Sequence, residues 1–243
     1  MNWIYLSPHF DDIALSCGGL VWEQAQAGNS VSLWTICGGD PPRRALSAYA
    51  QILHQRWETG VQATQARRGE DIAACQTLGV PFRHFGFPDC IYRPRRKDIP
   101  HYYTSDKAIF GTVHPAEGKN MVYRLSNIFR QEIPTGTQLV CPLTLGNHVD
   151  HVITRRAAER SGHALWYYPD YPYVLKSAAV LERYRQDGWK AVQFPISESG
   201  LRAWQDSVAR HTTQINTFWP NLEAMRAAIR DYAQGKVILW RQG

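Results

Sequence analysis

Residues 2–29 read NWIYLSPHFDDIALSCGGLVWEQAQAGN, and this stretch indicates the fold. Residues 2–7 form an apolar run with the length of a buried strand, whereas residues 13–27 carry apolar side chains with helical periodicity. The helix is expected to end at Gly28-Asn29, because glycine and asparagine are common at helix ends. Gly18-Gly19 inside it indicates close packing against a neighbouring element. A strand, a polar loop and a helix in this order begin a βαβ unit.

The alternation of strand and helix continues along the chain. The further predicted strands are 31–37, 83–87, 138–143, 165–168 and 191–194. The further predicted helices are 44–78, 120–132, 150–160, 199–218 and 222–232. Because alternating elements form right-handed βαβ units, we expect a Rossmann-like α/β fold whose mainly parallel sheet has helices on both faces. With 243 residues, 44% of them hydrophobic, the chain suits a single domain, residues 1–243.

Residues 88–118 interrupt this pattern, since they contain Pro, Tyr, Arg and Gly without a helical or strand period. A connection of this length in a compact domain is typical of a functional loop or lid insertion. We therefore expect residues 91–117 to form a mobile lid over the site, which brings Tyr92, Arg93 and Tyr102-Tyr103 to the substrate. A disordered surface excursion is the alternative.

Composition excludes several classes of protein. No run of about eighteen apolar residues occurs, so we expect neither a membrane-spanning helix nor a membrane partner. The first six residues lack the basic start and the apolar length of a secretory signal, which indicates the cytoplasm. The five cysteines are odd in number and widely scattered, which predicts reduced, buried thiols rather than a disulfide framework or a thiolate zinc site.

The formal net charge is +6, and the densest basic run is Arg93, Arg95, Arg96 and Lys97. Such a run can in principle meet phosphates. It is short, however, and no nucleic-acid motif accompanies it. A solvated loop is therefore the favoured interpretation, and nucleic acid is not an expected partner. An anionic small substrate stays open.

Histidines and carboxylates gather after two of the predicted strands, in SPHFDD (residues 7–12) and NHVDH (residues 147–151). The carboxyl ends of the strands in such a sheet open toward one crevice, where ligands bind. Asp89, which follows the strand 83–87, is expected at the same edge. Neutral imidazole and carboxylate are the usual ligands of catalytic zinc, which keeps one position for water. The two clusters together therefore predict a zinc site.

With these motifs the sequence resembles the LmbE-like or PIG-L-like N-acetylglucosaminyl deacetylases. The family signatures are an AHPDDE-type motif after the first strand and a later HPDH-type motif, and SPHFDDIALSCGG (residues 7–19) and HVDH (residues 148–151) are similar to both. The similarity continues in RRGEDIAACQTLGV (67–80), GFPDC (86–90) and, more faintly, HTTQ (211–214). It thus spans most of the chain in scattered blocks.

The resemblance implies one zinc ion per chain, with His9, Asp12 and His151 as its ligands. It also implies that Asp11 is the base for the metal-bound water and that His148 is a cation facing the oxyanion. General chemistry supports this division, because zinc lowers the pKa of bound water to about 7 and a nearby carboxylate can then take the proton.

Three further residues complete the implied site. Asp150 is expected to orient His148 as an outer partner. Arg67 matches a family position that contacts the sugar, although a solvated ion pair with Glu70 is an equally good interpretation. Asp89 is expected to bind a substrate hydroxyl, and a simple Pro-Asp turn is the alternative.

The sequence departs from the family pattern at three positions. Phe10 replaces the usual proline and Ile13 the usual glutamate of the first motif, and neither position needs to bind metal. Some relatives carry a tyrosine two residues before the first histidine of the second motif, where this chain has Gly146. Another residue, or His148 alone, therefore has to stabilise the oxyanion.

The expected function is a zinc-dependent hydrolase, an amidase that removes an acetyl or similar group from an amino sugar or its conjugate by attack of a metal-bound water. The expected partner is thus a small amino-sugar molecule. A mononuclear zinc hydrolase acting on a phosphorylated or anionic molecule is one alternative. A non-enzymatic nucleotide-binding module is another, although SCGG inside a helix is not a dinucleotide motif. The identity of the sugar, the acyl group and the oligomeric state, including a homo-oligomer, stay open.

Overall fold

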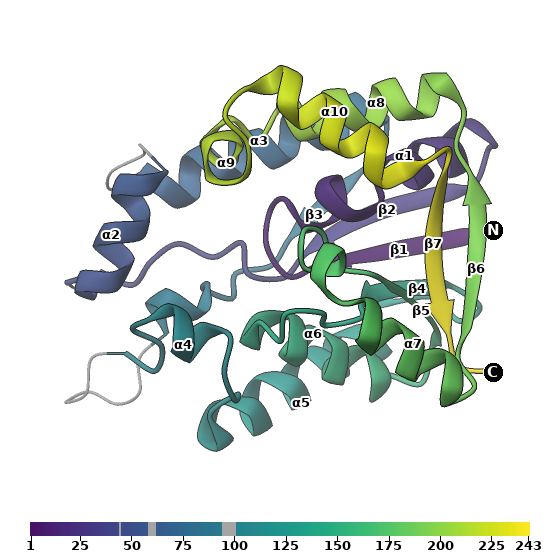
Figure 1. Ribbon diagram of the computed structural model, residues 1–243. Coiled ribbons are helices and arrows are strands. Elements are labelled where there is room, and N and C mark those ends of the chain that lie inside the picture. The colour runs from purple at the N-terminus through teal and green to yellow at the C-terminus, as the bar shows by residue number, and fades with distance from the viewer. Residues whose placement is uncertain (44, 58–61, 94–100) are drawn as a thin grey trace.

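A mixed sheet forms the centre of the protein in the computed structural model, which describes residues 1–43, 45–57, 62–93 and 101–243 (Figure 1). Within these residues the sheet has seven strands in the order β3-β2-β1-β4-β5-β7-β6. They are β1 (Asn2–Ser7), β2 (Ser30–Thr35), β3 (Phe82–His84), β4 (Gln138–Pro142), β5 (Ala164–Tyr168), β6 (Lys190–Pro195) and β7 (Lys236–Arg241). The first five pair in parallel, and β7 pairs antiparallel with β5 and β6.

Helices cover both faces of the sheet. They are α1 (Asp12–Gln26), α2 (Ala48–Arg56), α3 (Ala63–Leu78), α4 (Asp106–Ile109), α5 (Pro115–Glu132), α6 (Val149–Glu159), α7 (Ala178–Gln186), α8 (Glu198–Ala209), α9 (Thr212–Phe218) and α10 (Leu222–Ala233), with 3₁₀ turns at Cys90–Tyr92 and Tyr173–Lys176. Figure 1 shows α1, α3, α8 and α10 on one face and α5, α6 and α7 on the other. The predicted α/β fold with a mainly parallel, doubly covered sheet is confirmed. Among the described helices, none combines the length and the apolar character that crossing a membrane requires.

Strand β1 is buried on both faces because it lies between two helical layers. Its side chains alternate, as in any strand, between the two sides of the sheet. Ile4 and Leu6 join the core cluster on the side of α5 and α6, whereas Trp3 and Tyr5 join the cluster on the side of α1, α8 and α10. This double burial explains why residues 2–7 read as a continuous apolar run.

Two predicted helices are each a pair of helices in the structure. Residues 44–78 contain α2 and α3, and residues 58–61 between them lie outside the described residues. Residues 199–218 contain α8 and α9. The start of α9 is held by Glu70 of α3, whose carboxylate accepts hydrogen bonds from the Thr212 hydroxyl at 2.6 Å and the Thr213 backbone N–H at 2.8 Å. Helix α7 and strand β7 are additional to the predicted elements.

Part of the segment expected to be a lid is buried beneath the site. Residues 94–100, and with them the middle of the predicted lid 91–117, lie outside the described residues. Tyr92, Arg93 and Tyr103 are each less than 7% exposed. These three side chains are buried and do not form an exposed lid, but Tyr92 lines a small cavity with His9 and Asp89, so contact of this segment with the substrate stays a prediction.

Helix α1 has a kink one turn after its start, because Trp204 of α8 packs into it. Cys17 has non-helical backbone angles, and the Ala14 carbonyl accepts a hydrogen bond of 2.6 Å from the Trp204 indole. An inserted side-chain donor is a common cause of a kink. A Cβ atom on Gly18 or Gly19 would lie 2.9 or 2.7 Å from the Trp204 ring. The close packing expected at Gly18-Gly19 is confirmed.

We expect Gly19→Ala to lower the free energy of unfolding by about 1–3 kcal/mol, the usual cost of overpacking a filled core. Gly69→Ala is the matched control, since a Cβ there meets nothing within 4 Å. Because Gly69 lies in the interior of α3, alanine should instead add up to about 1 kcal/mol. Urea unfolding of both variants measures the difference. A stabilised Gly19→Ala protein would contradict the packing argument.

Candidate active site

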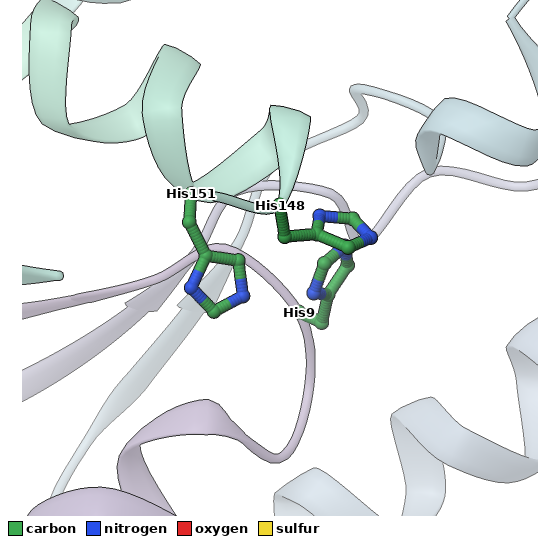
Figure 2. Close-up of side chains that lie close together, drawn as sticks. All are labelled: His9, His148 and His151. Carbon is green, nitrogen blue, oxygen red and sulfur yellow. The ribbon is translucent and has the colours of Figure 1, made fainter. Parts of the chain in front are cut away.

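The two predicted clusters meet at the point where the strand order reverses. The chain runs from β1 outward to β2 and β3 and then returns to β4 on the other side of β1. In open α/β sheets ligands bind at this switch point, outside the carboxyl ends of the strands. His9 lies in the loop after β1, while His148 caps α6 and His151 lies in its first turn. Figure 2 shows the three imidazoles gathered beside the start of α6.

Asp12 contacts two of these histidines directly. Its Oδ2 lies 3.4 Å from Nδ1 of His9, and its Oδ1 lies 3.2 Å from Nε2 of His151. The His9 backbone N–H donates to Asp12 Oδ2 at 2.7 Å, which fixes the turn between β1 and α1. His148 also has a ring nitrogen within 4.8 Å of the other two histidines. Asp12 thus bridges His9 and His151, as the predicted third ligand would, and its role as a ligand stays a prediction.

The geometry of this group fits a zinc ion. Ligands of tetrahedral zinc at roughly 2.0–2.2 Å lie about 3.4 Å apart, close to the two separations at Asp12. The second nitrogen of each histidine faces a buried carboxylate: His151 Nδ1 lies 2.6 Å from Asp170, and His9 Nε2 lies 3.1 Å from Asp150. Outer carboxylates of this kind orient histidine ligands and increase their basicity. His9, Asp12 and His151 can therefore hold the metal.

The charges at the site favour a cation. Burial alone would lower the pKa of His9, but Asp12, Asp150 and Asp89 outweigh it and raise that pKa well above its ordinary value. Burial is outweighed in the same way at His151, whose pKa rises to about 9 beside Asp12 and Asp170. Without a metal ion, the carboxylates thus stabilise the protonated forms of His9 and His151. A divalent ion would replace those protons.

His148 differs from the two ligand histidines. Burial, and then the nearby His9, lower the pKa of His148 well below its ordinary value, so its ring is neutral at pH 7. This direction disfavours a cation at His148, and the role of His148 toward the oxyanion stays a prediction. Its Nδ1 accepts a hydrogen bond of 3.3 Å from the Asp150 backbone N–H. The ring proton therefore resides on Nε2, which leaves His148 a neutral donor.

Asp11 and Arg67 form a buried ion pair in the same pocket. Arg67 Nη2 donates to Asp11 Oδ1 at 3.0 Å, and the guanidinium lies 4.8 Å from the centre of the Trp57 ring. A solvated pair between Arg67 and Glu70 is therefore wrong, since Glu70 binds the start of α9 instead. Asp11 is next to Asp12 in the chain and lines the pocket together with the three histidines.

Asp89 both caps a turn and lines the pocket, so the two interpretations of this residue do not exclude each other. Its Oδ1 accepts a hydrogen bond of 3.1 Å from the Ile91 backbone N–H, which caps the 3₁₀ turn Cys90–Tyr92. Its Oδ2 lies 3.7 Å from Nε2 of His9. Asp89 also lines the pocket together with Arg67. A hydrogen bond from Asp89 to a substrate hydroxyl stays a prediction.

The Asp150 carboxylate does not bind His148, contrary to expectation. It lies 3.1 Å from Nε2 of His9, accepts a hydrogen bond of 3.0 Å from the Cys90 backbone N–H and forms an ion pair with Arg93. Burial would raise the pKa of Asp150, but Arg93 and His9 outweigh it and hold the pKa well below its ordinary value. Asp150 is thus an ionised outer partner of His9, and only its backbone reaches His148.

A pocket of about 290 Å³ opens beside the histidine cluster. Besides the cluster it is lined by Asp11, Arg67 and Asp89 and by aromatic side chains from distant parts of the chain, namely Trp57, Phe110, Tyr173 and Phe218. Pockets with mainly apolar walls and a few convergent polar groups are typical of binding sites for small molecules. All residues expected in the metal and substrate site therefore lie around one pocket, except Asp150, which lies behind it.

Residues 4–161 match the PIG-L family, described as GlcNAc-PI de-N-acetylase, and so more than half of the chain is covered. The chain belongs to the PIG-L family. As a PIG-L protein it is a metal-dependent deacetylase, which confirms the predicted enzyme class, the cleavage of an N-acetyl amide bond and the predicted zinc.

Two kinds of relative resemble this PIG-L chain. A 2′-N-acetylparomamine deacetylase from Niallia circulans is 29% identical over 214 residues, which cover 78% of this chain and 72% of that protein. A deacetylase from the biosynthesis pathway of teicoplanin is 26% identical, with a TM-score of 0.82 over 99% of this chain and 97% of that one. The zinc-inhibited form of a teicoplanin deacetylase, 24% identical with a TM-score of 0.83 over 99% and 96% of the two chains, shares the fold.

Two residues behind the PIG-L site were given no role in it from the sequence. Asp170 follows β5 and binds both His151 and, through its other oxygen, the Leu145 backbone N–H at 3.0 Å. Its position after a parallel strand could have indicated it, because such ends share one edge of the sheet. Arg93 was expected in a solvated basic run, yet it is buried between Asp150 and Glu117. The remainder of that run, residues 95–97, lies outside the described residues.

We expect Arg93→Met to lower the free energy of unfolding by about 3–5 kcal/mol, because it leaves the buried carboxylates of Asp150 and Glu117 without their cation. The matched control is Arg226→Met, which removes the largely exposed pair with Asp206 and should cost about 0–1 kcal/mol. Urea unfolding of the two metal-free proteins compares the costs. Equal costs would show that Arg93 is no more than a surface charge.

Proposed function

We propose that the protein removes the acetyl group from an N-acetylated amino sugar that is part of a larger glycoside. The arrangement of Asp11 beside Asp12, His9 and His151 in one pocket carries this proposal, because it joins a metal site to a separate carboxylate base. The relatives named as deacetylases of acetylparomamine and in teicoplanin biosynthesis support a glycoside substrate. The aromatic walls of the pocket offer apolar surface for sugar rings and an aglycone.

His9, Asp12 and His151 would hold one zinc ion. When bound, zinc supplies Lewis acidity, which polarises a carbonyl oxygen and makes water a nucleophile at neutral pH. Asp150 and Asp170 fix the orientation of the two histidines from behind. The protein thus supplies a rigid set of ligands whose outer partners are already in place.

Asp11 is proposed to move the proton during hydrolysis. It accepts a proton from the attacking water as the carbon–oxygen bond forms, and it returns the proton to the nitrogen as the carbon–nitrogen bond breaks. The products are acetate and the free amine. Arg67 holds Asp11 in position through the hydrogen bond of 3.0 Å. Arg67 is therefore a positioning residue whose removal would misplace the base.

His148 is proposed to stabilise the oxyanion as a neutral donor. Its Nδ1 accepts from the backbone N–H of Asp150, and Nε2, which lies 4.0 Å from Cys90 Sγ, would donate to the carbonyl oxygen. Asp89 would accept a hydrogen bond from a sugar hydroxyl, since it lines the pocket next to the cluster. These roles divide the reaction among three polar groups around one amide.

The test is acetate release by the zinc-loaded protein. Three substrates should be compared, namely 2′-N-acetylparomamine, an N-acetylglucosaminyl glycopeptide and free N-acetylglucosamine. We expect higher kcat/KM for one of the two glycosides than for the free sugar, because contacts remote from the amide contribute to catalysis. Hydrolysis of p-nitrophenyl phosphate without acetate release would instead favour the phosphoesterase alternative. Release from the free sugar alone would contradict the proposed substrate class.

We also propose that the enzyme is located in the cytoplasm. All five cysteines of the chain are buried and free. Reduced thiols are the ordinary state in a reducing compartment, whereas exported proteins more often pair them. Fractionation of the producing cells, followed by detection of the protein with an antibody, tests this location.

A further inference from the structure

The ring of Tyr173 lies beside Gly146, which comes just before the second metal motif, residues 148–151. Gly146 has φ +86°, a left-handed conformation that favours glycine. A Cβ atom at this position would lie 2.6 Å from Cγ and 2.7 Å from Cδ1 of Tyr173. The Tyr173 ring therefore packs directly against the backbone of Gly146, which lies two residues before His148 in the chain.

Tyr173 is held against the site by its own segment of chain. The Asp170 backbone carbonyl accepts a hydrogen bond of 2.9 Å from the Val174 N–H, and the Asp170 side chain binds His151. The Tyr173 ring packs edge-on against Phe110 at 5.6 Å and lies 6.3 Å from the His151 ring. The segment that orients a metal ligand thus also positions Tyr173.

The phenol group of Tyr173 belongs to the pocket. Tyr173 lines it together with His9, Asp11 and His148. Within the described residues, no protein group accepts a hydrogen bond from its hydroxyl, whereas Tyr49 in the same pocket donates to Asp106 at 2.6 Å. A polar group in such a pocket with no protein acceptor is available to a ligand.

The Tyr173 hydroxyl carries its proton near neutral pH, because the ordinary pKa of tyrosine is about 10. Burial, followed by the negative charges of Asp12 and Asp11, raises the pKa of Tyr173 above that value. The group can therefore donate a hydrogen bond.

We propose that Tyr173 donates its phenolic O–H to the carbonyl oxygen of the scissile amide as that oxygen gains negative charge. The inference rests on the proposed deacetylation. Tyr173 and His148 then supply two neutral donors around one oxyanion, and Tyr173 is a catalytic residue that the sequence motifs do not contain. The loop after β5 contributes this donor, and Gly146 makes room for it.

Tyr173→Phe tests the proposal because it removes only the hydroxyl. We expect kcat to fall about 10²-fold with KM little changed, as for a donor that acts mainly in the transition state. Zinc content and the urea midpoint should stay those of the wild type. Tyr184→Phe is the control, since its hydroxyl accepts from Arg155 on α6, outside the pocket, and its turnover should stay within twofold. A kcat of Tyr173→Phe within threefold of the wild type would overturn the proposal.

A binding measurement separates this role from mere packing. The N-methylphosphonyl derivative of the product amine carries a tetrahedral anion where the acetyl group would be. Its affinity for the zinc-loaded Tyr173→Phe protein, measured by calorimetry, should fall at least tenfold, whereas the affinity for the product amine should not change. Equal losses for both ligands would show a structural role and sink the proposal. If the wild-type protein releases no acetate from any substrate, the proposed function itself fails. If the wild-type protein is active and Tyr173→Phe matches it in kcat and in affinity for the tetrahedral anion, only the Tyr173 donor fails.

Discussion

His151→Ala is expected to yield a folded protein that contains no zinc after dialysis and has less than about 1% of the wild-type turnover. Removing an outer partner of a metal ligand already costs about 10–100-fold, and this change removes a ligand itself. Only His9 and Asp12 would remain, and two ligands bind zinc poorly. Metal analysis and acetate release measure the two losses.

The control for this variant is His163→Ala. His163 is half-buried, its Nε2 lies 3.2 Å from the Phe129 carbonyl oxygen, and it is not among the described residues that line the pocket. Its zinc content should equal that of the wild type. A His151→Ala protein with one full equivalent of zinc would remove His151 from the ligand set and make His148 the candidate third ligand beside His9 and Asp12.

Asp11→Asn is expected to keep its zinc but to lose turnover by about 10²–10⁴-fold, the usual contribution of a general base. Asparagine has the same shape and can still accept the hydrogen bond from Arg67, so the pocket should be preserved. It cannot take a proton. Comparing kcat with bound zinc for the same preparation distinguishes loss of the base from loss of the metal.

Asp40→Asn provides the matched change outside the site. Asp40 pairs with Arg68 at the surface, and its side chain is 70% exposed. Its substitution should alter turnover by less than twofold. If Asp11→Asn lost zinc, Asp11 would be a ligand and the division of roles between Asp11 and Asp12 would be wrong.

The sequence was sufficient to bring the metal ligands together. His9 and His151 follow β1 and β4, whose apolar runs are evident in the sequence, and the carboxyl ends of neighbouring parallel strands must lie at one edge. Because side chains three residues apart lie on the same face of a helix, His148 and His151 at the start of α6 were also expected to point to the same side. The site therefore depends mostly on local pattern and on one rule of topology.

The partners of the charged residues were harder to predict. Asp150 lies two residues after His148, and positions two apart on a helix do not face each other, so its carboxylate turns to His9 and Arg93 instead. Arg93 looked solvated because its neighbours in sequence are basic. Its burial depends on Glu117 and Asp150, which come from elements distant in sequence.

Strand β7 and helix α7 escaped prediction for different reasons. Strand β7 enters the sheet antiparallel after the left-handed residues Gln234 and Gly235, and direction in a sheet is not encoded by apolar pattern. Helix α7 has no buried residue, so it lacks the apolar stripe from which a helix is recognised. Both elements lie at the end of the sheet beyond β5.

The hydrogen bond between Asp170 and His151 joins a part of the chain that matches the PIG-L family to a part that lies outside the match. His151 lies inside the stretch 4–161 by which the family is recognised, whereas Asp170 lies beyond it. Trp204, which bends α1 behind the first motif, lies further on still. A fragment cut at residue 161 would therefore carry both metal motifs of the family and yet lack the outer support of its own metal site. The stretch that identifies the family is therefore shorter than the stretch that supports the metal site.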